Sequence, residues 1–258
     1  RRVRRDPAPE PIHRLRTATR RLAAAVTIAI DQFGLPPSVP WSDWEALRTK
    51  LGRLRNLDVT RQVLLEFQSQ VSGNHKALRH EIRHLARARS RASRRAVAEL
   101  EHHRTGRIPR TIRKLAPQAA RPADLLAAAL GWWALAARPF ALDESWRGSL
   151  VDRLSRKSGR EAVHELRIRL RDIRYGLDWW NQLGLSTLPQ LVTFLRDAQD
   201  TLGVIRDYQR AAKVLSGPGL RRFRAAVLTA RAAEIGRWPA VARRGDYWGS
   251  SPFEGSPR

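Results

Sequence analysis

Hydrophobic residues recur every three to four positions along most of the chain, which is the period of an amphipathic α-helix. Strand-like alternation of β-branched residues is absent, and Pro and Gly fall between the periodic segments. The pattern therefore predicts an all-α protein. The expected helices cover residues 10–33, 42–71, 75–104, 124–138, 146–156, 160–184, 188–215 and 219–236, with a short helix and loop over 110–122.

Three expectations concern the segments between and after these helices. Pro239 is expected to lie beyond the last helix, and the last dozen residues, rich in Gly, Ser and Pro, are expected to form a loose tail. The longest apolar stretch, 125–137, is Ala-rich and interrupted by Gly131, which is typical of a buried helix. No segment approaches 18 uninterrupted apolar residues, so we expect no insertion into a membrane.

The chain contains an internal repeat. The segment around His13 (12–22) resembles the segment around His164 (163–173), and Leu-Gly-x-x-Arg occurs at 51–55 and again at 202–206. Both pairs of motifs are separated by 151 residues. The repeat predicts two related halves, 1–121 and 122–258. A helix precedes the second His motif, only twelve residues precede the first, and Met is absent, so we expect a shortened N-terminus.

Each repeated helix is predicted to have one basic face and one apolar face. At about 100° per residue, the His and Arg positions of each copy share a face, and the Leu and Ile positions lie opposite. The first copy places His13, Arg16 and Arg20 together, and the second places His164, Arg167, Arg171 and Arg174 together with Tyr175 beside His164. Such stripes are usually solvated faces, but these contain only donors, at matched positions in two copies. A compensating anion is the simplest physical reason for them.

The charge of the chain limits the class of partner. There are 49 Lys and Arg residues against 24 Asp and Glu residues, a formal net charge of +25. This excess indicates nucleic acid, an anionic membrane or polyphosphate as the partner. Arg supplies nearly all of the positive charge, and its planar guanidinium donates two parallel hydrogen bonds to phosphate oxygens.

Two further stripes are basic. Arg79, Arg83 and Arg87 share a face of the third expected helix, and Arg48 and Arg55 flank Gly52 on the second. Gly52 and Gly203 both weaken a helix, so their matched recurrence suggests that another helix or a ligand backbone packs closely there.

The sequence gives little support for catalysis or for a metal site. Cys is absent, no Walker-type loop occurs, and no acidic residue is placed to join His80 and His84 in binding a metal. No carboxylate repeats with the two histidines as a catalytic partner would, so we expect neither enzymatic activity nor a cofactor. Asp58, Asp172 and Asp207 are expected to form local caps or ion pairs.

The chain resembles the CHAD domain, the conserved-histidine α-helical domain. The resemblance rests on His13-x-x-Arg16-x-x-x-Arg20-Arg21, on the matching motif from His164 to Tyr175, and on the two Leu-Gly-x-x-Arg segments. It implies two pseudo-two-fold related four-helix bundles around a basic cleft that binds inorganic polyphosphate. It also implies a cytoplasmic protein, with polyphosphate granules as one location.

The motif and the stripes together define a candidate polyphosphate site. It consists of His13, Arg16, Arg20, Arg21, Arg48, Arg55, Arg79, Arg83, Arg87, His164, Arg167, Arg171, Arg174, Tyr175 and Arg206. The two copies differ, because Ala23 occupies the position of Arg174, Asp172 that of Arg21, and Asn56 that of Asp207. Their contributions are therefore not expected to be equal.

Two alternatives remain open. A protein of this charge binds DNA non-specifically, although its basic faces carry no interleaved aromatic residues for base stacking. It could instead serve as an accessory module of an enzyme that metabolises polyphosphate or a triphosphate.

Overall fold

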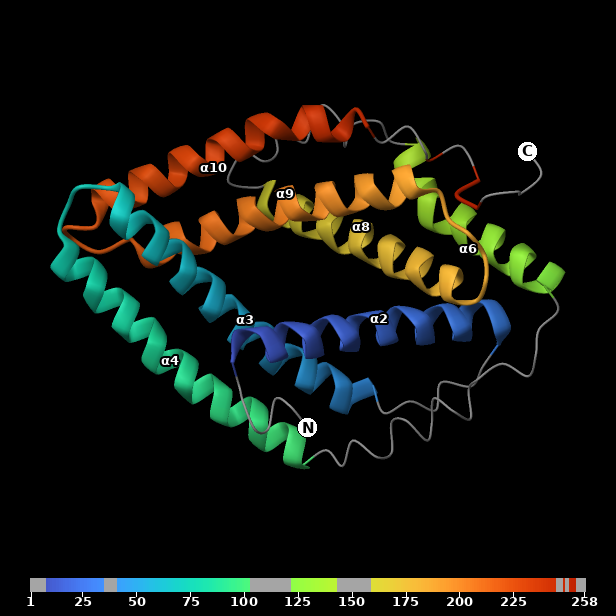
Figure 1. Cartoon of the computed structure of the whole chain (residues 1–258), viewed down its shortest axis with the longest axis horizontal. Coiled ribbons are helices and arrows are strands. Elements are labelled where there is room, and N and C mark those ends of the chain that lie inside the picture. The colour runs from blue at the N-terminus through green and yellow to red at the C-terminus, as the bar shows by residue number, and fades with distance from the viewer. Residues whose placement is uncertain are drawn as a thin grey trace. The chain divides into compact units, whose positions relative to one another are not determined.

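The helical pattern forms as expected in the computed structural model, which describes residues 8–34, 41–102, 122–142, 159–244, 248 and 251–253 (Figure 1). The described residues form seven α-helices and no β-strand, apart from one isolated β-bridge between Thr187 and Phe253. The all-α prediction is confirmed. The helices are α2 (Pro9–Phe33), α3 (Trp41–Gln70), α4 (His75–His102), α6 (Pro122–Leu142), α8 (Gly159–Gln182), α9 (Pro189–Val214) and α10 (Arg221–Ala242).

Most helix ends lie within a few residues of the predicted positions. Gly34 and Gly184 follow α2 and α8 with positive φ angles of 60° and 92°, a backbone conformation that glycine adopts without strain at helix ends. The predicted helix at 146–156 and the short helix at 110–122 lie outside the described residues, apart from Pro122 at the start of α6.

Contacts between Cα atoms divide the chain into two compact units. Unit 1 comprises residues 1–20, 38–114 and 205–231, and unit 2 comprises 21–37, 115–204 and 232–258. The units do not follow the predicted boundary between residues 121 and 122, because α2, α9 and α10 each continue from one unit into the other. The compact units reflect which residues touch, whereas the predicted halves reflect which segments resemble each other in sequence. The two related halves therefore remain a prediction.

Unit 1 has two hydrophobic clusters. The first joins α3, α4, α9 and α10 through buried side chains that include Phe67, Leu78 and Phe223. The second joins the start of α2 to α3 and α4, and its fully buried members are Ile12, Leu51 and Leu54. The second cluster holds the first histidine helix against α3, because Ile12 immediately precedes His13.

Unit 2 has an aromatic core. The Trp179 and Trp180 rings of α8 lie 4.6 Å apart between centroids, and Phe33 of α2 packs within 6.3 Å and 6.2 Å of them. Gly176 of α8 allows Trp132 of α6 to approach closely, because a Cβ atom there would lie 2.1 Å from the indole ring. These contacts place the second histidine helix, α8, against α2 and α6.

Three sequence expectations are wrong. The helix α10 continues through Pro239 to Ala242, because burial of Trp238, Val241 and Ala242 outweighs the lost backbone donor, and Arg243 still donates to the Pro239 carbonyl. The helix α6 is not buried all round. Its buried face contains Ala129, Trp133 and Ala137, whereas Leu135 is 67% exposed.

The described residues of the expected tail, 248 and 251–253, also differ from expectation, and the others lie outside the described residues. Trp248 and Phe253 are buried, and Trp248 stacks on Phe140 with a centroid distance of 4.3 Å. The Leu188 amide donates to the Pro252 carbonyl at 2.8 Å. Aromatic burial therefore outweighs the loop-forming composition of this segment. Across the described residues, no helix has the length and apolarity that spanning a membrane requires.

Candidate functional site

The basic face of α2 in unit 1 is positioned by the apolar residues behind it. Ile12 is fully buried and Leu15 packs partly buried against the same cluster, so His13 is turned outward and is exposed. Arg16 and Arg20 follow on this face and are half-buried. Arg55 of α3, which follows the buried Leu54, is close enough to influence the charge of His13. We call His13, Arg16, Arg20 and Arg55 the His13 cluster.

The His13 cluster disfavours a protonated imidazole. Although the His13 side chain is exposed, loss of water contact on the side facing its neighbours is the largest cause that lowers its pKa, followed by the positive charge of Arg55. Arg16 and Arg20 lower the pKa further, while Glu10 acts in the opposite direction. Four groups that can donate hydrogen bonds to an anion therefore lie near one another, and the three arginine charges lower the pKa of the histidine.

The basic face of α8 in unit 2 has the same construction. Leu166, Leu170 and Ile173 are buried on one side, and His164, Arg167 and Arg174 are half-buried on the other. Arg171 shares this face, but its side chain is only 15% exposed and contacts Asp172 at 2.7 Å.

Tyr175 lies buried beneath two guanidinium groups. The Arg174 Cζ atom lies 4.9 Å from the centroid of its ring, and the Arg21 Cζ atom lies 6.0 Å away, so both form cation–π contacts. Arg21 also forms an ion pair with Asp178 at 3.4 Å. The Nε atom of Arg174 is buried and donates no hydrogen bond within the described residues. Tyr175, Arg174, Arg21 and Asp178 form the Tyr175 cluster.

The Tyr175 cluster revises one expectation and adds one residue that the sequence pattern did not indicate. Tyr175 is 4% exposed, so it supports the arginines instead of presenting its ring on the basic face. Asp178, which the sequence analysis did not select, neutralises part of the Arg21 charge. Asp178 lies three residues after Tyr175, so the helical period places both on one face of α8. The period does not reveal the partner of Asp178, because Arg21 lies on another helix.

The predicted acidic partners form ion pairs. Asp58 contacts Arg89 at 2.7 Å, and Asp207 contacts Arg210 at 2.8 Å. Together with the Asp172–Arg171 pair, these contacts confirm the expected ion pairs, although the Asp58–Arg89 pair joins α3 to α4 and is not local. On the further stripe of α3, Arg48 pairs with Glu45 at 3.4 Å.

The two repeated glycines do not serve close helix packing. A Cβ atom built on Gly52 would meet no atom within 4 Å. A Cβ atom on Gly203 would lie 4.0 Å from the Nε atom and from one terminal nitrogen of Arg167. Among the described residues, no helix backbone therefore packs against either glycine, and Gly203 instead faces the Arg167 side chain of α8.

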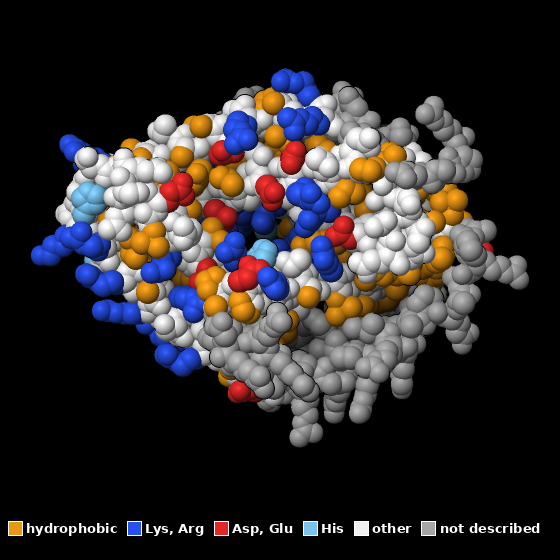
Figure 2. All heavy atoms as spheres, in the orientation of Figure 1, with side chains coloured by type: hydrophobic (Ala, Val, Ile, Leu, Met, Phe, Trp, Pro, Cys, Tyr) orange, Lys and Arg blue, Asp and Glu red, His pale blue; other side chains and the backbone are white. Residues whose placement is uncertain are grey.

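The outer face of α4 forms a basic stripe in unit 1. Arg79, Arg83 and Arg87 are exposed, and no ion pair involves them among the described residues. Figure 2 shows basic side chains along the edge where Figure 1 places α4. The charges that act on His13 come from α2 and α3, so membership of the α4 stripe in one site with His13 remains a prediction. Arg206 of α9 is half-buried, and its role also stays a prediction.

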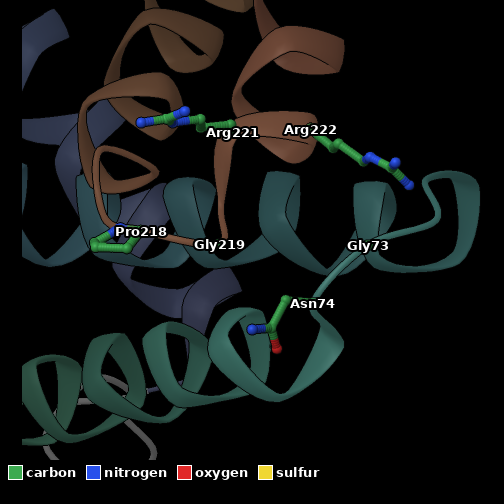
Figure 3. A pocket seen from close by; sticks show the side chains of 6 residues that line it. All are labelled: Gly73, Asn74, Pro218, Gly219, Arg221 and Arg222. Atoms are coloured by element: carbon green, nitrogen blue, oxygen red, sulfur yellow. The ribbon is translucent and has the colours of Figure 1, made fainter.

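An open pocket of about 550 Å³ lies in unit 1 beside the turns α3–α4 and α9–α10. Its lining includes Asn74, Gly219, Arg221 and Arg222. Gly219 is required there, because its φ angle is +78° and a Cβ atom would lie 3.0 Å from the Asn74 amide nitrogen. Figure 3 shows Arg221 and Arg222 extending in opposite directions, so the two guanidinium groups do not converge on one anion.

No group of three or more potential metal-binding side chains occurs among the described residues. His84 instead lies 4.0 Å from Glu81, one turn away on α4. The chemistry concentrated on α2, α3 and α8 is therefore that of hydrogen-bond donors and positive charge.

Comparison with known proteins agrees with the motif. The model of the CHAD domain family matches residues 1–216. A crystal structure of the CHAD domain from the plant Ricinus communis superposes with a TM-score of 0.65 and 20% sequence identity, covering 98% of this chain and 86% of that one. A search among curated proteins found no match. With its helical fold, its two His/Arg motifs and the match over most of its length, the chain belongs to the CHAD domain family.

Proposed function

We propose that this protein is a non-catalytic module that binds inorganic polyphosphate through the basic faces of α2, α3 and α8. The observation that carries the proposal is the convergence of Arg16, Arg20 and Arg55 on His13, in a motif that recurs at His164. Arginine is suited to phosphate, because its guanidinium donates paired hydrogen bonds while keeping its charge.

The ligand's charge density supports polyphosphate over an isolated phosphate. A linear polyanion carries a negative charge on every phosphorus, so a single molecule can contact several arginines and release the counterions on both sides. The net charge of +25 then opposes folding less, because bound phosphate neutralises it. In this proposal, binding is steeply salt-dependent, no cofactor takes part, and the protein acts in the cytoplasm, including at polyphosphate granules.

Calorimetric titration with long-chain polyphosphate tests the site. We expect the double variant Arg16→Ala/Arg167→Ala to bind at least about tenfold more weakly, the equivalent of about 1.4 kcal/mol. The matched control is Arg224→Ala/Arg243→Ala, which removes the same charge from exposed positions. Equal losses in the two double variants would show that only net charge matters and would refute the site.

Non-specific nucleic-acid binding is the second candidate, and the net charge favours it. Competition at moderate salt separates the two. Polyphosphate should displace DNA from the protein, and excess DNA should not displace polyphosphate. A phosphate-release assay with magnesium or manganese tests the non-catalytic part of the proposal, since sustained turnover would identify an enzyme.

A further inference from the structure

Within the described part of the chain, no close contact requires a glycine at position 52 or 203. Glycine in the middle of a helix is destabilising by about 1 kcal/mol relative to alanine, so a retained glycine normally has a steric cause. Gly176 shows such a cause, because Trp132 fills the space that a Cβ atom would need. Gly52 has open space around its Cβ position, and Gly203 has only the guanidinium of Arg167 at ordinary contact distance.

Both glycines lie among the basic residues of the proposed site. On α3, Arg48 precedes Gly52 by four residues and Arg55 follows it by three, so all three positions share a helix face. On α9, the Gly203 position lies against the Arg167 side chain of α8. An open helical glycine is not a site by itself, because Gly236 of α10 is equally open. The other two differ in recurring within the same motif and beside site arginines.

We propose that Gly52 and Gly203 are clearance positions that let an unsubstituted phosphate chain lie directly against the helix backbone. This inference rests on the proposed function and adds a basis for selectivity. A polyphosphate chain has no groups wider than its tetrahedral phosphates, so it can enter the gap left by a missing side chain. The phosphates of a nucleic acid carry sugars and bases, which hold the strand further out, within reach of the long arginine side chains only.

The physical consequence of adding one methyl group is specific. At Gly52 the methyl would project from the helix face that Arg48 and Arg55 share, where the ligand is proposed to lie. At Gly203 it would lie 4.0 Å from the already buried Nε atom and from one terminal nitrogen of Arg167, beside which the ligand is proposed to lie. Neither substitution creates a clash, since ordinary van der Waals contact begins at these distances. Alanine therefore fits the folded protein at both positions and removes only the clearance.

The test compares Gly52→Ala, Gly203→Ala and the double variant with Gly236→Ala, the matched control. All three sites should gain helix stability, with a rise in Tm of about 2–4 °C for each substitution. We expect each of the first two variants to bind long-chain polyphosphate at least about threefold more weakly, and the double variant about tenfold. Binding of single-stranded oligodeoxythymidylate should change less than twofold, and Gly236→Ala should leave both affinities unchanged.

The outcomes distinguish failure of the clearance role from failure of the proposed polyphosphate binding. Unaltered polyphosphate affinity in the stabilised double variant would overturn the clearance role while leaving the proposed function intact. Equal weakening of polyphosphate and oligonucleotide would also overturn it, because selectivity would then have another source. Failure of the unsubstituted protein to bind polyphosphate at all would refute the proposed function itself. Loss of polyphosphate affinity with a raised Tm and retained oligonucleotide affinity supports the inference.

Discussion

Individual side chains in this protein hold basic groups close together. Tyr175 is buried, yet two guanidinium groups lie over its ring, so the tyrosine restricts the arginines that would otherwise move freely in solvent. The pKa of His13 is lowered by desolvation and by the positive charges around it. Both arrangements prepare the surface for an anion, because the donors are already grouped and the unfavourable repulsion is relieved when a negative charge binds.

We predict that polyphosphate binding strengthens as the pH falls through the titration of His13. The pKa of His13 in the free protein is lowered, so folding disfavours its protonated form, and this group reduces stability as the pH drops below about 6.5, the usual value for histidine. A bound polyanion stabilises the imidazolium and raises its pKa. Binding therefore takes up a proton between the two pKa values.

The measurement is calorimetric titration at several pH values between about 8 and 5, with His13→Gln as the comparison. The variant should lose part of the gain in affinity at low pH. If the variant and the unsubstituted protein show the same pH dependence, His13 does not contact the ligand.

Helices set which residues can act together. The α4 helix buries Leu78, Ile82 and Leu85 on one side, which leaves Arg79, Arg83 and Arg87 in a row on the other. Like charges in such a row weaken the helix unless an anion compensates them. These three arginines are spaced four residues apart, and each turn of helix advances about 5.4 Å. A long polyanion can therefore contact all three at once, whereas a short one cannot.

We predict that the α4 stripe contributes to the binding of long chains. In the variant Arg79→Gln/Arg83→Gln/Arg87→Gln, long-chain polyphosphate should bind several-fold more weakly and with a smaller salt dependence, because fewer counterions are released. Short-chain polyphosphate should bind unchanged, since it is held by the His13 cluster alone. Titrations with both chain lengths at several salt concentrations give the answer. A loss that is equal for short and long chains would place these arginines within the His13 cluster.

The two compact units are built differently although they share helices. Unit 1 uses aliphatic packing with Phe67 and Phe223, whereas unit 2 relies on tryptophan. The chain end belongs to the core of unit 2, because Trp248 packs against Trp133 and Phe140. The stability of unit 2 therefore depends on residues that are far away in the sequence.

We predict that Trp248→Ala strongly destabilises the protein. Removal of a buried Trp side chain costs about 3–5 kcal/mol, through lost burial and the cavity that remains. Thermal unfolding followed by circular dichroism measures the change. Leu228→Ala is the control, because Leu228 is 39% exposed and its loss should alter stability by less than about 0.5 kcal/mol. Similar melting temperatures for the two variants would mean that the chain end adds nothing to unit 2.

Most of the fold and part of the site could be predicted from local pattern. Helix positions follow from the 3.6-residue period, since each helix depends on near neighbours for its hydrogen bonds and for its buried stripe. The same period placed Arg16 and Arg20 beside His13 and revealed the repeat that gave the family.

Other features depend on contacts between distant segments, for which the local pattern contains no signal. Burial of Tyr175 beneath Arg21, docking of Trp248 and continuation of α10 through Pro239 all arise from packing that outweighs local preference. The repeated glycines show most clearly what each level determines. The sequence motif located them, but only the tertiary structure shows that no described residue fills the space around Gly52.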